Sequence, residues 1–80
     1  MNNREKYINA FVEGLEIDSE IVKEGLEYQA IPEWDSVGHM GLISALEDAF
    51  DIEMDTDDII DLSSFEKGME ILANNYQIVF

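Results

Sequence analysis

Apolar residues recur at helical spacing near the start of the 80-residue chain. Four of them follow the i, i+3, i+4, i+7 order that puts side chains on one face of a helix. This pattern predicts an amphipathic helix from about Asn3 to Leu15, with Asn2 as its N-terminal cap and Glu5 three residues later in the capping sequence. The predicted buried stripe consists of Ile8, Phe11, Val12 and Leu15.

Three more helices are predicted in the second half of the chain. One runs from Asp35-Ser36, where either side chain can accept a hydrogen bond from the first turn, to about Phe50. A short helix covers about Thr56 to Leu62, and the last helix starts at a capping box formed by Ser63 and Glu66. The apolar residues expected on their inner faces are Leu42, Ile43, Leu46 and Phe50 in the first, Ile59, Ile60 and Leu62 in the second, and Phe65, Met69, Leu72 and Tyr76 in the third.

The segment between the first two helices lacks helical periodicity. Asp18-Ser19-Glu20 predicts a single turn that folds Ile21 and Val22 inward, and Gly25 and Pro32 predict a long ordered loop after it. We expect this loop to pack over the core, because it carries four apolar residues. They are Leu26, Tyr28, Ile31 and Trp34.

These elements predict an all-α fold, a small four-helix bundle with three longer helices, one short third helix and a long loop between helices one and two. Residues 1–80 have the length of a single domain with a modest core. An EF-hand is excluded in the acidic run that follows Phe50. Counted from Asp51, the positions that need glycine and glutamate hold Thr56 and Leu62. We therefore predict no metal site.

The charge balance narrows the choice of partners. Nineteen acidic residues oppose four basic ones, for a formal net charge of −15. Such a surface repels nucleic acid and anionic membranes, and it attracts basic patches on other proteins. The chain has no cysteine, so it lacks a disulfide framework and a thiol nucleophile of its own. No targeting segment or membrane span is recognised, and we expect a cytoplasmic monomer.

The stretch Trp34-Asp35-Ser36-Val37-Gly38-His39-Met40 is the most informative about chemistry. A serine in the first turn of a helix lies at the positive end of the helix dipole, where a phosphate esterified to its hydroxyl is favoured. The simpler interpretation is that Asp35 or Ser36 only caps the helix. A hydrolase in which His39 activates Ser36 is disfavoured, because both residues share one helix and no buried carboxylate is evident to orient the histidine.

The wider context distinguishes between these interpretations. After Asp35-Ser36 come Leu46-Glu47-Asp48-Ala49-Phe50-Asp51-Ile52-Glu53, then Asp57-Asp58-Ile59 and Ser63-Ser64-Phe65. From Trp34 to about Leu72 this arrangement resembles the acyl carrier protein family, which has Asp-Ser-Leu, an acidic pair before phenylalanine, an acidic Ile-rich connection and a Thr- or Ser-capped last helix. The first helix and the long loop also agree with that family in length.

The resemblance implies a function without catalysis by the chain itself. Ser36 would receive a 4′-phosphopantetheine group from coenzyme A through a phosphodiester, by the action of a separate Mg²⁺-dependent phosphopantetheinyl transferase. The thiol of that arm would hold an acyl group as a thioester for acyl-loading and acyl-processing enzymes with basic docking patches. The residues that the resemblance assigns to partner contact are Asp35, Val37, Met40, Glu47 and Asp48.

Several departures and alternatives remain. Val37 replaces the usual leucine, and Gly38 and Gly41 stand where housekeeping carriers often have acidic residues, which we interpret as room for a partner's backbone. The string resembles discrete carriers of specialised fatty acid, polyketide or glycan-related pathways. A peptidyl or aminoacyl carrier and an unmodified acidic helical interaction domain stay open, as does a role for His39 in partner contact.

Overall fold

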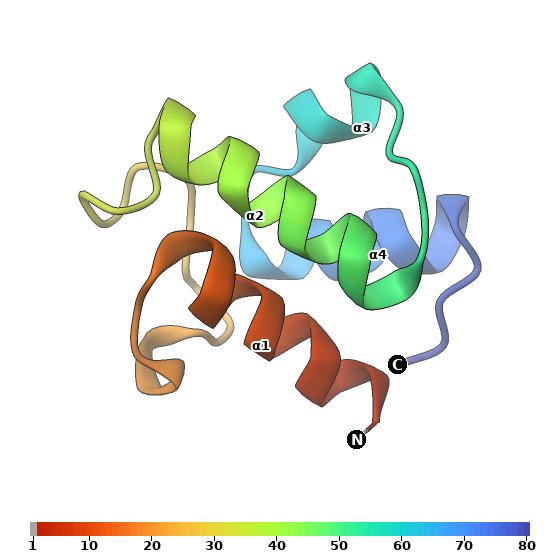
Figure 1. Cartoon of the computed structure of the whole chain (residues 1–80), viewed down its shortest axis with the longest axis horizontal. Helices are drawn as coiled ribbons and strands as arrows, with labels where there is room; N and C mark the ends of the chain where they lie inside the picture. Colours follow the sequence, from red (N-terminus) through yellow and green to blue (C-terminus); the bar gives the residue numbers. More distant parts are fainter. Residues whose placement is uncertain (1) are drawn as a thin grey trace.

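The computed structural model describes residues 2–80, and this part of the chain is helical with no strand. Its elements are α1 (Asn3–Leu15), a short 3-10 helix η1 (Ser19–Ile21), α2 (Ser36–Phe50), α3 (Thr56–Asp61) and α4 (Phe65–Asn75). They pack around one hydrophobic core. Figure 1 shows how the helices are arranged. The predicted starts of the four helices and the predicted ends of the first three are confirmed to within a residue.

Helices α1 and α2 run side by side in opposite directions (Figure 1). Their backbones touch at two glycines: a Cβ on Gly14 would lie 2.6 Å from the Cα of Leu42, and one on Gly41 would lie 2.7 Å from the carbonyl oxygen of Gly14. A Cβ on Gly38 would collide with the carbonyl oxygen of Glu33. Our interpretation that Gly38 and Gly41 make room for a partner is therefore wrong, because both glycines serve packing within the chain.

The buried face of α1 is rotated from the predicted one. Tyr7 and Ala10 are buried with Phe11 and Leu15, whereas Ile8 and Val12 are only partly buried. The sequence pattern missed Tyr7 because of its polar hydroxyl, which donates a hydrogen bond of 2.7 Å to the carbonyl oxygen of Phe65. Burial raises the pKa of Tyr7 above its ordinary value.

The long loop packs over the core as predicted. Val22, Leu26 and Trp34 are buried, and Tyr28 and Ile31 pack against them. The predicted single turn is present as η1, but Ile21 is 40% exposed, so the prediction that it folds inward is wrong. A single turn has one side toward the core and one toward solvent. Of these two residues, only Val22 is buried.

Backbone hydrogen bonds tie this loop to the start of α4. The N–H of Phe65 donates to Leu26, and the N–H of Tyr28 donates to Ser63, each at 2.9 Å. This pairing keeps Ser63 in the connection, so Ser64 is the N-cap of α4 and accepts from the N–H of Lys67. The predicted capping box is therefore not formed, and the cap lies one residue later than predicted.

The carboxylate of Glu66, which the predicted box would have used at the helix start, has a different partner. Its Oε1 accepts a hydrogen bond of 3.0 Å from the backbone N–H of Gly25 in the loop. Gly25 has a φ of +97°, a conformation that glycine adopts without strain. The charge of Glu66 thus helps to hold the loop instead of capping its own helix.

Candidate functional site

Ser36 is the first residue of α2, and its side chain is exposed. The cap of the helix is Asp35, whose Oδ1 accepts a hydrogen bond of 2.8 Å from the N–H of Gly38. The choice that the sequence left between the two residues is thus settled for Asp35. Because Ser36 is not needed as the cap, its Oγ is free to face Tyr28, whose hydroxyl lies 3.2 Å away.

A cavity of about 430 Å³ opens beside Ser36, between α2, α3 and the long loop. Its walls are mostly apolar, and its polar atoms come from a few side chains near the loop. A pocket of this size with apolar walls and few polar groups is typical of sites for small molecules or ligand chains. The lining residues are Tyr28, Ser36, His39, Met40, Ile59, Ile60, Leu62 and Ser63.

His39 joins three parts of the structure at the wall of this cavity. Its Nδ1 accepts a hydrogen bond of 2.9 Å from the indole N–H of Trp34, and its Nε2 lies 2.7 Å from the carbonyl oxygen of Ile59. An indole N–H can only donate and a carbonyl can only accept. His39 must therefore be neutral, with its proton on Nε2, to make both bonds. The imidazole links the loop, α2 and α3.

The same bonds argue against a nucleophile–base pair. Both ring nitrogens of His39 are directed to Trp34 and Ile59, and the hydroxyl of Ser36 is paired with Tyr28. A general base must lie within hydrogen-bond reach of the hydroxyl it activates. In this arrangement Ser36 and His39 are therefore not hydrogen-bonded to each other as a nucleophile and its base.

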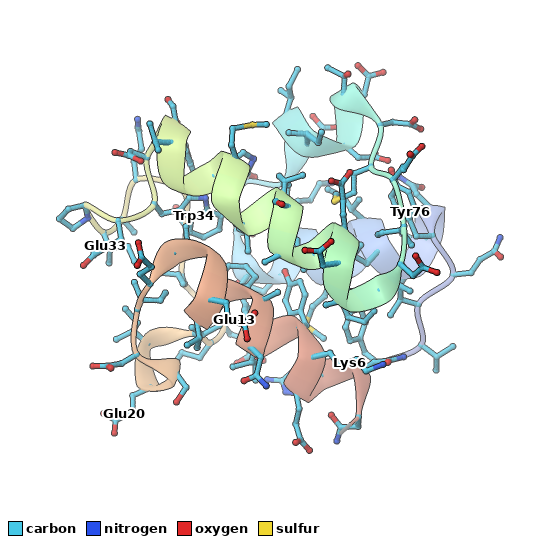
Figure 2. All side chains as sticks on the ribbon, in the orientation of Figure 1. Lys6, Glu13, Glu20, Glu33, Trp34 and Tyr76 are labelled. Atoms are coloured by element: carbon cyan, nitrogen blue, oxygen red, sulfur yellow. The ribbon has the colours of Figure 1, made fainter. Side chains whose placement is uncertain are left out.

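Helix α3 forms one wall of the cavity, and its other end is held by Tyr76, the residue that follows α4. The hydroxyl of Tyr76 donates to Asp58 Oδ2 at 2.7 Å and accepts from the N–H of Asp55 at 2.8 Å. Asn75 adds a bond of 2.9 Å to Asp58 Oδ1. Figure 2 shows Tyr76 next to the connection between α2 and α3, far from Trp34 in the loop before α2. Polar contacts thus hold α3 on two sides.

The residues predicted for partner contact separate into two groups. Val37 and Met40 are exposed by 81% and 58%, and Ile60 of α3, expected to be buried, is 71% exposed. Met40 and Ile60 line the cavity, and Val37 lies three residues before Met40 on the same face of α2. We call Val37, Met40 and Ile60 the apolar rim.

The three acidic residues predicted for partner contact, Asp35, Glu47 and Asp48, differ in exposure. Asp35 and Asp48 are exposed, and Asp48 borders a second hollow between α1 and α2 with Lys6 and Glu13. Glu47 is partly buried, and its Oε2 accepts a hydrogen bond of 2.9 Å from the N–H of Met54. Glu47 therefore holds the connection to α3, a structural task that its sequence position did not reveal.

Sequence reasoning missed the part that Tyr28, Trp34 and His39 play together around Ser36. Tyr28 and Trp34 were expected only to cover the core, and no motif signals that an indole will pair with an imidazole five residues later.

None of the helices within residues 2–80 has the length and apolar content needed to cross a bilayer. Over the same described residues, no three potential ligands gather as a metal site.

Comparison of the chain with protein-family models, with curated proteins and with solved structures found no match.

Proposed function

We propose that the chain is an acyl carrier protein, whose Ser36 carries a 4′-phosphopantetheine arm and which does not itself catalyse a reaction. One observation carries the proposal: the exposed hydroxyl of Ser36 lies at the edge of an apolar cavity of about 430 Å³. An attachment point and a compartment for an apolar cargo are thus adjacent. The four helices would form the small bundle expected of such a carrier.

The residues present suit this group. Ser36 is accessible to a transferase, and a helix start favours a phosphate on its first residue. Asp35, the nearest acidic side chain in the sequence, is bonded to the N–H of Gly38, which offsets part of its repulsion toward a phosphate. When attached, the arm supplies the thiol for a thioester, a group that the cysteine-free chain lacks.

The cavity walls support an acyl cargo over an aminoacyl one. Met40, Ile59, Ile60 and Leu62 offer hydrocarbon surface, and methionine adapts its shape to irregular partners. A charged aminoacyl group would lose its hydration against these walls without gaining a partner of opposite charge. We propose a carrier of a specialised fatty acid, polyketide or glycan-related pathway.

The partners would be a phosphopantetheinyl transferase and the enzymes that load or process the acyl group. Each would contact the apolar rim and carry basic residues around that contact. With a formal net charge of −15, the chain attracts such surfaces over a distance and increases the rate of encounter. Nucleic acid and membranes are not among the proposed partners.

The apolar rim also favours a second candidate, an unmodified acidic helical interaction domain. Exposed apolar side chains that lie together are typical of protein contacts whether or not a neighbouring serine is modified. The two candidates differ in one measurable property, the covalent modification of Ser36.

The test is to incubate the purified apo chain with coenzyme A, Mg²⁺ and a promiscuous phosphopantetheinyl transferase, and to measure its intact mass. We expect a gain of one phosphopantetheine group, its loss in Ser36→Ala, and its retention in Ser44→Ala, which removes an exposed serine of the same helix. An unchanged mass of the wild type, while a control carrier is modified, would favour the interaction domain.

A further inference from the structure

The hydroxyl of Tyr28 lies 3.2 Å from Ser36 Oγ in a position set by the long loop. Tyr28 is eight residues before Ser36 and belongs to a different element. Its backbone N–H donates a hydrogen bond of 2.9 Å to Ser63, just before α4. The main chain of Tyr28 is therefore anchored independently of α2.

The ring of Tyr28 is also held in place. It meets Trp34 edge to face, with ring centroids 6.3 Å apart, and His39 in the same manner at 5.5 Å. Such edge-to-face contacts are a preferred arrangement of aromatic pairs. Trp34 and His39 are in turn joined by their hydrogen bond of 2.9 Å. The hydroxyl of Tyr28 is thus directed at Ser36 before any group is attached.

Modification of Ser36 would decide which of the two hydroxyls donates. In the unmodified chain either oxygen can be the donor. Esterification removes the hydrogen of Ser36 Oγ, so only Tyr28 can donate afterwards. The new acceptors would be charged phosphate oxygens, and a hydrogen bond to a charged acceptor is roughly twice as strong as a neutral one. The contact should therefore strengthen when the arm is attached.

We infer that Tyr28 is a positioning residue for the phosphate group on Ser36: its hydroxyl donates a hydrogen bond to that group and holds the root of the arm at the edge of the cavity. Tyr28 also lines the cavity, so one side chain would contact both the arm and the space for its cargo. This inference rests on the proposed function, because it requires Ser36 to be modified.

The experiment compares four proteins, the apo and holo forms of the wild type and of Tyr28→Phe, by urea unfolding. Phenylalanine keeps the ring and removes only the hydroxyl. We expect attachment of the arm to lower the unfolding equilibrium constant about tenfold more in the wild type than in the variant, as for one charge-assisted hydrogen bond. This double difference cancels any effect of the substitution that is common to both forms.

Tyr76→Phe is the matched control. It also removes one tyrosine hydroxyl, but that hydroxyl bonds Asp58 and does not line the cavity. We expect it to destabilise the apo and holo forms equally. As a second measurement, the ³¹P resonance of the holo protein should move in Tyr28→Phe and stay in place in Tyr76→Phe.

The outcomes separate the two proposals. Mass spectrometry shows first whether the wild type is modified; an unmodified wild type would overturn both the function and the role of Tyr28. If both proteins are modified but attachment stabilises them equally and the ³¹P resonance does not move, the role of Tyr28 is refuted and the carrier function stands. A tenfold difference with a displaced resonance supports both.

Discussion

Replacement of His39 by phenylalanine tests the bridge between the loop, α2 and α3. Phenylalanine keeps a planar ring next to the indole of Trp34, with which the imidazole is stacked at an interplanar angle of 15°. It removes the hydrogen bonds to Trp34 and to Ile59. The change therefore isolates the polar contribution of His39 from its packing.

The magnitude follows from what the two partners lose. Trp34 is fully buried, so its N–H would be left without water or protein, at a cost of about 1–3 kcal/mol. The carbonyl of Ile59 belongs to a partly exposed residue and can turn to water, so about 0.5–1.5 kcal/mol is expected there. The sum, about 1.5–4.5 kcal/mol, is a large part of the roughly 4–12 kcal/mol expected for a domain of this length.

Urea unfolding followed by circular dichroism measures this loss, and fluorescence locates it. Trp34 is the single tryptophan of the chain, so its emission reports on the site of the bond alone. A double-mutant cycle with Trp34→Phe removes donor and acceptor in turn, and we expect a coupling of about 1 kcal/mol or more. A loss below about 0.5 kcal/mol in His39→Phe, the range of ordinary surface changes, would refute the bridge. Additive effects of the two substitutions in the cycle would refute the contribution of the hydrogen bond between Trp34 and His39.

Two further predictions concern the packing of α1. Gly41→Ala should destabilise the chain by about 2 kcal/mol or more in urea unfolding, because the added Cβ would meet the backbone of Gly14; at an open helix site the same change would stabilise by up to about 1 kcal/mol. The free energy of unfolding should also fall above about pH 10. Burial raises the pKa of Tyr7 in the folded chain, so the phenol ionises first in the unfolded chain. The unfolded chain then binds fewer protons than the folded one, and rising pH favours it. Measured between pH 9 and 12, the decline should be less steep in Tyr7→Phe, by up to about 1.4 kcal/mol per pH unit.

Each of these has a contrary result. A Gly41→Ala variant as stable as the wild type would mean that α1 and α2 do not touch at Gly14. Equal slopes against pH in Tyr7→Phe and the wild type would mean that Tyr7 ionises as readily in the folded chain as in the unfolded one.

Helix bounds could be predicted because their signals are local. Asn2 and Asp35 accept hydrogen bonds from N–H groups three residues ahead, at 2.8 Å in each case. A cap of this kind needs no other part of the chain, and a residue such as Asp35 announces it wherever it precedes an apolar periodic run. The position of Ser36 at the start of a helix followed from the same signal.

The remaining features depend on contacts between distant segments. Tyr7 can be buried because a carbonyl oxygen 58 residues away accepts a hydrogen bond from its hydroxyl. Ser64 replaces Ser63 as the cap of α4 because the backbone of Ser63 pairs with the loop. The carboxylate of Glu47 accepts a hydrogen bond from the backbone N–H of Met54, which lies in the connection after α2. Periodicity contains no information about such partners, so the faces of the helices and the surroundings of Ser36 had to come from the structure.

The anchoring of α3 has a mechanical consequence. None of its six described residues is fully buried, and its N-cap residue Asp55 makes no side-chain bond to the first turn. Ile59 packs against the core, and the other attachments of the helix are a few polar contacts to its neighbours. We therefore expect α3 to open at a lower free energy than the core around Phe11. If α3 opens in this way, one wall of the cavity is compliant and the other is rigid, and we expect the space between them to widen for a longer ligand without unfolding of the whole chain.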